Sequence, residues 1–180
     1  MKAFVKKVVR WTLRLLCTPL RRSYRKRNGV VDHKDVHELP NETFLALVND
    51  LLAQGKSVTI WGKGYSMRPF IEHERDRVKL KRMEEVRVGD AVLAQPRKGW
   101  FVLHRIIAIE GDHITLQGDG NIYGTEHCLR NQICGTAIEY IRPSRTILTS
   151  DPALCRRIRL WRRLRPVRRY LLFIYKCICI

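Results

Sequence analysis

The chain has 180 residues and a formal net charge of +18, from 35 Lys and Arg against 17 Asp and Glu. This length fits one domain with a core of ordinary size and additional segments at both ends. The charge is uneven, because residues 1–27 hold ten Lys and Arg, residues 155–180 hold nine, and neither segment contains an acid. The basic charge therefore belongs to the two ends, and residues 28–154 are nearly neutral.

The first segment, residues 1–27, is predicted to form a basic amphipathic helical arm. Its apolar residues recur at helical intervals and its Lys and Arg take the other side. Charged residues interrupt it every few positions. Its apolar stretches are therefore too short for a transmembrane helix, which needs about 18–20 apolar residues. Residues 28–40 are expected to be a linker that ends at Pro40.

The middle segment, residues 41–150, is predicted to be a mainly β domain. Asn41 is a suitable N-cap for an amphipathic helix that closes at Gly55. From there the apolar period changes to alternation, which predicts short strands separated by Gly-rich turns, at residues 57–61, 77–80, 90–94, 100–109, 113–117 and 135–141. We expect a small, curled antiparallel sheet with one helix ahead of it.

The last segment, residues 151–180, is predicted to be a second basic arm. A helical apolar stripe is followed after Pro166 by an apolar run at residues 170–175, the stripe being Leu154, Ile158, Trp161 and Leu164. Basic helices with aromatic residues on the apolar side bind membrane interfaces. We therefore expect peripheral association with an anionic membrane surface, by default at the cytoplasmic face. Packing of these helices on the domain itself or on a partner stays open, and contact with nucleic acid is less favoured.

The six cysteines show neither a paired framework nor a metal-binding pattern. His127, Cys128 and Cys134 lack a fourth ligand at a suitable spacing for zinc. We expect free thiols, no metal and no organic cofactor.

Ser66 is a candidate nucleophile. It directly follows the first predicted strand, in a turn with Gly62 and Gly64 before it and Pro69 after it. Such a turn exposes the hydroxyl and brings backbone N–H groups close enough to serve as oxyanion donors. The alternative is an ordinary turn serine.

His104 is a candidate general base. Strand alternation places it on the face shared by Val102 and Ile106, where a neutral imidazole can accept a proton. An ordinary core histidine is the alternative. Arg105 is expected to point the other way as a solvated strand residue.

Asp119 is a candidate for the acid that orients the histidine. It stands between two glycines, a position that also suits a simple turn. Glu126 follows a few residues later and is the second candidate for this role.

The order of these segments resembles the type I signal peptidase family, in the Ser-His branch found in archaea and the endoplasmic reticulum. The resemblance covers roughly residues 57–140 and rests on four stretches, at residues 66–69, 88–92, 102–106 and 118–121. It implies a coiled antiparallel β fold. It also implies that Ser66 is the nucleophile, that His104 stands where bacterial-type enzymes have a lysine, and that Asp119 matches the aspartate of the Gly-Asp box.

The chain also departs from the family pattern. No transmembrane segment precedes Ser66, and Arg75-Asp76 stands where a Gly-Asp commonly follows the serine box. The paired acids of the endoplasmic-reticulum enzymes would fall near Gly124 and Thr125, where Glu126 is the only acid nearby. We therefore expect a narrower set of substrates than general signal-peptide processing.

The function expected from the sequence is that of a serine-type endopeptidase. It would cleave a peptide or leader segment of a protein substrate that binds in extended conformation at a strand edge. Two alternatives stay open. One is a self-cleaving repressor-type peptidase, which would have a lysine as base and an N-terminal helix-turn-helix. The other is a catalytically inactive β module that binds membrane or nucleic acid through its arms. The sequence leaves the oligomeric state open.

Overall fold

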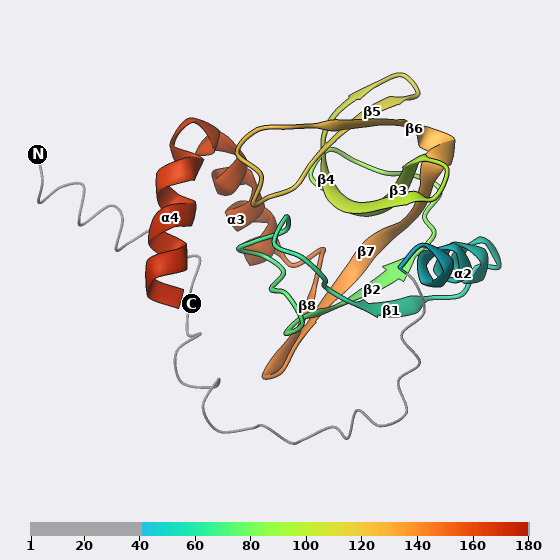
Figure 1. Cartoon of the computed structure of the whole chain (residues 1–180), viewed down its shortest axis with the longest axis horizontal. Coiled ribbons are helices and arrows are strands. Elements are labelled where there is room, and N and C mark those ends of the chain that lie inside the picture. The colour runs from blue at the N-terminus through green and yellow to red at the C-terminus, as the bar shows by residue number, and fades with distance from the viewer. Residues whose placement is uncertain (1–40, 180) are drawn as a thin grey trace, which may run out of the picture.

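The computed structural model describes residues 41–179 (Figure 1). The predicted arm at residues 1–27 and the linker at 28–40 lie outside the described residues. The elements, labelled as in Figure 1, are α2 Asn41–Ala53, β1 Val58–Trp61, β2 Arg77–Lys81, β3 Ala91–Arg97, β4 Trp100–Glu110, β5 His113–Gln117, β6 Glu126–Leu129, η2 Arg130–Gln132, β7 Ile133–Arg142, β8 Arg145–Leu148, α3 Pro152–Arg163, η3 Arg165–Val167 and α4 Arg168–Cys179.

The strands of the described chain form one antiparallel sheet of eight strands. Their order is β1-β2-β7-β3-β4-β5-β6, with β8 paired to β7. Register shifts interrupt β2, β3 and β4 where they pair with their neighbours. Such irregularities bend strands and increase their twist, and here they accompany the curl of the sheet visible in Figure 1. The prediction of a mainly antiparallel β sheet is confirmed, and in the part of the chain that the structure describes the helix α2 precedes it.

Two strands were not predicted from the sequence. β6 and β8 have four residues each, and most of their side chains are at least partly exposed. Four residues with one buried side chain at most give no measurable alternation, so pairing with a neighbouring strand decides their conformation. β7 also begins two residues before the predicted start at residue 135.

Both faces of the sheet are covered at its centre. On β3, Ala91 and Leu93 belong to a core shared with α2, α3 and α4, whereas Val92 and Ala94 belong to a second core shared with β4, β5 and β6. Alternate side chains of one strand therefore enter two different apolar clusters. The second cluster lies inside the curl, and the first joins the sheet to the helices.

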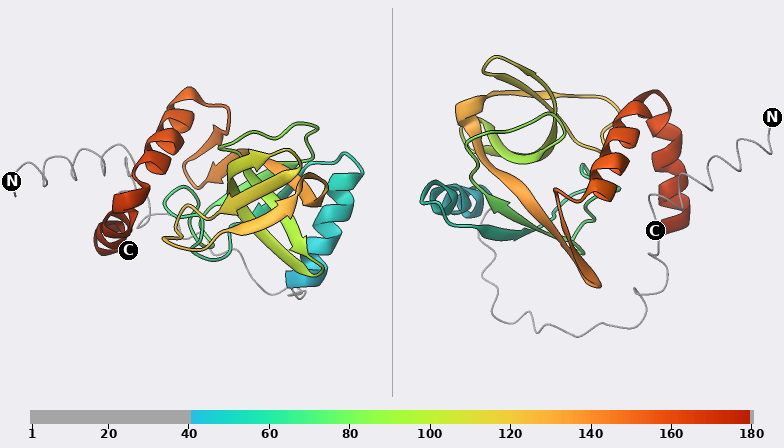
Figure 2. Two further views of the ribbon diagram at one scale, coloured as in Figure 1. Left: turned by 90° about the horizontal axis from the view of Figure 1, so that it is seen from above. Right: turned by 180° about the vertical axis from the view of Figure 1, so that it is seen from behind.

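The C-terminal helices pack on the sheet, at the end of the domain opposite α2 (Figures 1 and 2). Asp151 caps α3 by accepting hydrogen bonds from the N–H groups of Ala153 and Leu154, at 2.6 and 3.0 Å. The predicted apolar stripe Leu154, Ile158 and Trp161 is buried in the core. The expectation that this stripe faces a membrane is therefore wrong, because it packs on the protein's own domain. Within residues 41–179 no helix has the length and apolar character needed to cross a bilayer.

Candidate active site

Ser66 lies in the loop between β1 and β2, residues 62–76, here called the serine loop. Two backbone hydrogen bonds of 2.8 Å close its base, from the N–H of Gly62 to the carbonyl of Asp76 and from the N–H of Glu74 to the carbonyl of Gly62. A Cβ at Gly62 would lie 2.6 Å from Ile71 Cγ2, so the tight base requires glycine there. The two ends of the loop are thus hydrogen-bonded to each other, and Ser66 lies between them.

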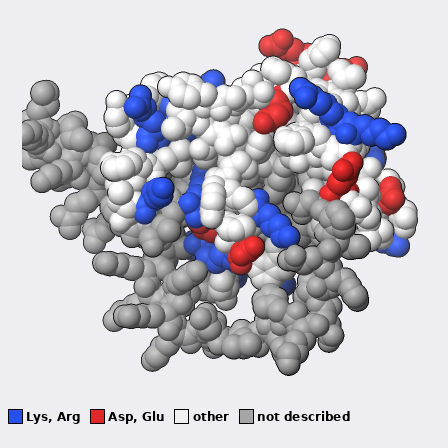
Figure 3. All heavy atoms as spheres, viewed as in Figure 1, with Lys and Arg blue, Asp and Glu red and all other residues white. Residues whose placement is uncertain are grey.

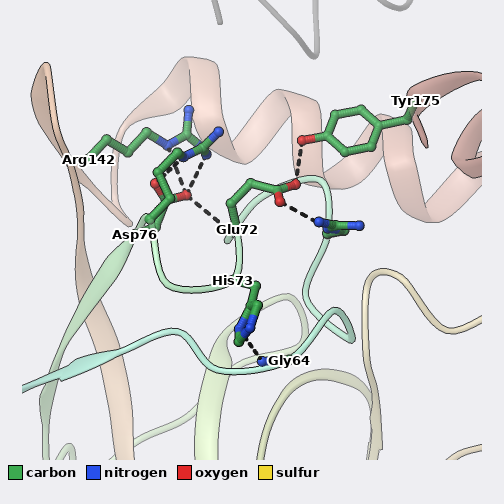
Figure 4. Close-up of polar contacts among 8 residues, drawn as sticks. Gly64, Glu72, His73, Asp76, Arg142 and Tyr175 are labelled. Atoms are coloured by element: carbon green, nitrogen blue, oxygen red, sulfur yellow. Dashed lines mark hydrogen bonds and ion pairs between the residues drawn. The ribbon is translucent and has the colours of Figure 1, made fainter. Parts of the chain in front are cut away.

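Polar side chains brace the rest of the serine loop (Figure 4). The Glu72 carboxylate accepts hydrogen bonds from Arg68 Nε at 2.9 Å and from the hydroxyl of Tyr175 on α4 at 2.5 Å. The buried Asp76 carboxylate accepts from Arg75 Nε at 2.7 Å and from the N–H of Glu72 at 3.0 Å. These charge-assisted contacts link the turn after Ser66 to its own base and to the C-terminal helix.

The Gly-Asp-Gly segment at residues 118–120 packs directly on the Ser66 turn. Gly120 donates its N–H to the carbonyl of Ser66 at 2.7 Å. A Cβ at Gly118 would lie 2.5 Å from the Ser66 carbonyl oxygen, and one at Gly120 would lie 2.5 Å from that of Tyr65. The two backbones therefore approach so closely that only glycine fits at both positions.

His104 is paired with Glu126. Its Nδ1 lies 2.7 Å from Oε2 of Glu126, which stands at the start of β6. The pairing of β5 with both β4 and β6 sets this geometry, since Gln117 faces Arg105 and Leu116 faces Glu126. A carboxylate that accepts a hydrogen bond from Nδ1–H leaves Nε2 free as a proton acceptor, which is the tautomer a general base requires.

Ser66, His104 and Glu126 line one cleft of about 260 Å³. Its apolar lining includes Met67 and Val102. Within residues 41–179 the structure has no hydrogen bond between Ser66 and His104. In enzymes without substrate, such catalytic contacts are often longer and tighten in the complex. The cleft thus holds a hydroxyl, an oriented imidazole and its carboxylate partner.

Asp119 faces Arg105 and not His104. Its carboxylate accepts hydrogen bonds from Arg105 Nη2 at 2.6 Å and Arg105 Nε at 2.9 Å, and the two residues are only 2% and 1% exposed. The orienting role predicted for Asp119 therefore fits Glu126 better, and Asp119 positions the segment that contacts the Ser66 turn.

The expectation that Arg105 is solvated is wrong. Alternation does place it opposite His104, but that face is also covered, since Arg105 Cζ lies 5.3 Å from the ring centroid of Phe70. Its guanidinium also donates to the carbonyl of Gly89 at 2.7 Å. Burial alone would lower the pKa of Arg105, but the charge of Asp119 raises the pKa above its usual value. Arg105 thus stays charged, and its buried contact with Asp119 holds the segment that contacts the Ser66 turn.

Two further supporting residues come from the C-terminal helices. Trp161 Nε1 donates to the carbonyl of Asp119 at 2.9 Å. Arg168 Nη1 lies 3.3 Å from Gln117 Oε1 and 3.2 Å from the carbonyl of Asn121. Sequence reasoning assigned both residues to a membrane-binding arm, and no local pattern distinguishes a tryptophan or arginine of this kind from an interfacial one.

Among residues 41–179, no group of three or more His, Cys, Asp and Glu could hold a metal ion. The thiols of Cys128 and Cys134 are free and buried, and burial raises the pKa of both, that of Cys134 to about 11.

Comparisons with known proteins gave no match, whether to family models, to curated proteins or to solved structures.

Proposed function

We propose that the protein is a serine endopeptidase of signal-peptidase-like type. The observation that carries the proposal is the 2.7 Å pair of His104 and Glu126 in the cleft that also contains Ser66. A buried imidazole with a carboxylate on one nitrogen and a serine turn beside it is the arrangement used to activate a hydroxyl. The resemblance of the four sequence stretches to signal peptidases supports the same reaction.

In this reaction Ser66 Oγ attacks the carbonyl carbon of the scissile peptide bond while His104 Nε2 takes the hydroxyl proton. Glu126 stabilises the imidazolium that results. His104 then returns the proton to the leaving amine, which departs and leaves an acyl ester on Ser66. Water attacks this ester with His104 again as base, which releases the carboxylic acid product and restores the serine.

The substrate is proposed to be a polypeptide segment in extended conformation. Residues 100–104 of β4 pair with β3 on one side, while the pairing of β4 with β5 starts only at Arg105. Phe101, Val102 and Leu103 of this stretch line the cleft. An extended segment can therefore add along this edge of β4 and bring its scissile bond to Ser66.

We further propose that the enzyme acts at an anionic membrane surface as a peripheral protein. The charge of the two end segments supports this part of the proposal. Residues 1–27 contain ten Lys and Arg, residues 155–180 contain nine, and neither segment contains an acid.

The test is covalent labelling of the purified full chain by a fluorophosphonate, which reacts with activated serines. The parent and a Ser144→Ala control should be labelled, Ser66→Ala should show no labelling, and His104→Ala should lose most of it. Labelling of Ser66→Ala at the parent's rate would contradict the assignment of the nucleophile. A folded parent that stays unlabelled would favour the inactive β module instead.

A further inference from the structure

α4 carries apolar side chains on two opposite faces. Leu171 and Tyr175 on the inner face are buried, Leu171 in the core that joins the helices to the sheet and Tyr175 against Glu72 of the serine loop. Tyr170 and Phe173 on the outer face are 60% and 68% exposed. The inner face is sufficient to pack the helix on the domain, so the fold does not require the outer aromatic side chains.

The outer face of α4 continues onto the serine loop. Tyr170 and Phe173 line a groove of about 580 Å³ together with Tyr65 and Arg68 of the serine loop and with Ile122. Tyr65 and Ile122 are also exposed apolar residues. We call the set Tyr65, Ile122, Tyr170 and Phe173 the outer patch. It is thus one surface formed by α4, by the serine loop and by the segment between β5 and β6.

The surroundings of the outer patch are positively charged. Arg169 and Lys176 line the groove and are exposed, as is Arg165 one turn earlier. Residues 152–179 contain nine Lys and Arg and no Asp or Glu, and Figure 3 shows Lys and Arg among uncharged side chains on the part of this face formed by α4. Like charge disfavours the basic residues 1–27 of the chain as the occupant of this surface, and charge complementarity favours an anionic one.

We propose that the outer patch and its basic rim are the face by which the protein docks on an anionic lipid bilayer. Aromatic side chains surrounded by Lys and Arg on one helix face are suited to the headgroup region, where the rings enter the acyl boundary and the cations contact phosphates. This inference rests on the proposed membrane-surface function and names the surface that carries it out.

Docking in this way would place the serine loop beside the bilayer. Tyr175 on the inner face of α4 holds Glu72, and Glu72 holds Arg68, two residues after Ser66. The segments cleaved would then be those that lie at the membrane surface.

The test is site-specific photocrosslinking of the full chain to vesicles. Phe173→benzoylphenylalanine should form lipid adducts with phosphatidylglycerol-containing vesicles and not with pure phosphatidylcholine. The matched position is Phe44→benzoylphenylalanine on α2, at the other end of the domain (Figure 1) and exposed as well, where we expect no adduct. Adducts at neither position, or equal adducts at both, would overturn the inference.

Vesicle affinity gives a second readout. Replacing both outer aromatics (Tyr170→Ser with Phe173→Ser) should weaken binding to anionic vesicles about tenfold or more, because two apolar insertions are lost. Phe44→Ser with Leu47→Ser should bind as the parent does. A double variant that binds like the parent, or a parent that binds RNA and not vesicles, would contradict the inference. Fluorophosphonate labelling without vesicles is a separate measurement, so failure of the docking face and failure of the peptidase proposal are distinguishable.

Discussion

Two carboxylates close in sequence take different parts in the candidate site because their surroundings differ. Asp119 is buried and forms an ion pair with Arg105, whereas Glu126 lines the cleft, is partly exposed and contacts His104. Removing one partner of a buried ion pair leaves the other charge uncompensated, which is strongly destabilising. Removing a partly exposed charge affects mainly the group that it orients. The two residues should therefore respond differently to the loss of charge.

We expect Glu126→Gln to keep the fold and to lower the rate of fluorophosphonate labelling of Ser66 at least tenfold, because an amide cannot stabilise the imidazolium of His104. Asp119→Asn should instead lower the free energy of unfolding by about 3–5 kcal/mol. Labelling kinetics and thermal unfolding of both variants give the comparison. Unchanged labelling of a folded Glu126→Gln protein would show that Glu126 does not orient the base.

At the scale of elements, the serine loop depends on segments distant in sequence. The segment after β5 contacts the Ser66 turn through Gly120, α3 holds that segment through Trp161, and α4 holds the loop through Tyr175. Each contact reaches backbone or a charged side chain of the site. The position of Ser66 is thus set by the packing of several elements and not by its own turn alone.

The contact between Gly120 and the Ser66 turn can be tested by Gly120→Ala. The added Cβ would lie 2.5 Å from the carbonyl oxygen of Tyr65, a backbone atom that cannot move without displacing Ser66. We expect labelling of Ser66 to fall at least tenfold while the circular dichroism spectrum keeps its β character.

The control for this variant is Gly111→Asn. Gly111 has a φ of +60°, which asparagine tolerates, and a Cβ added there would have no atom within 4 Å. Its labelling should match the parent. Equal labelling of both variants would mean that the close approach at Gly120 has no influence on the nucleophile.

At the scale of the whole molecule, the C-terminal helices complete the core. Trp161 is among the largest fully buried side chains. α3 and α4 together supply five buried hydrophobic residues, of which Leu154, Ile158, Trp161 and Leu171 belong to the first apolar cluster and Tyr175 is the fifth. Losing even one large core side chain typically costs about 3–5 kcal/mol, a large part of the stability of a domain this size. Residues 41–150, the bounds predicted for the domain, therefore do not contain the whole of this core.

Truncation tests this directly. A chain that stops after Ser150 should lose cooperative thermal unfolding, whereas a chain that stops after Lys176 retains all five buried residues and should unfold near the parent's temperature. A cooperative transition in the shorter chain would show that the helices are dispensable for the fold.

The amino-acid sequence alone was enough to predict most local elements and to name candidate site residues. Periodicity is a property of neighbouring residues, so the helix at residues 41–53, six of the strands and the strand position of His104 were predictable. The folded chain was needed to establish which acid contacts the histidine, what packs against Arg105, and which surface the stripe Leu154, Ile158 and Trp161 covers. An amphipathic pattern indicates that one helix face is apolar, but it does not indicate whether a sheet, a membrane or a partner buries that face. That choice depends on contacts between residues far apart in the chain, which form only when the sheet curls and the helices pack on it.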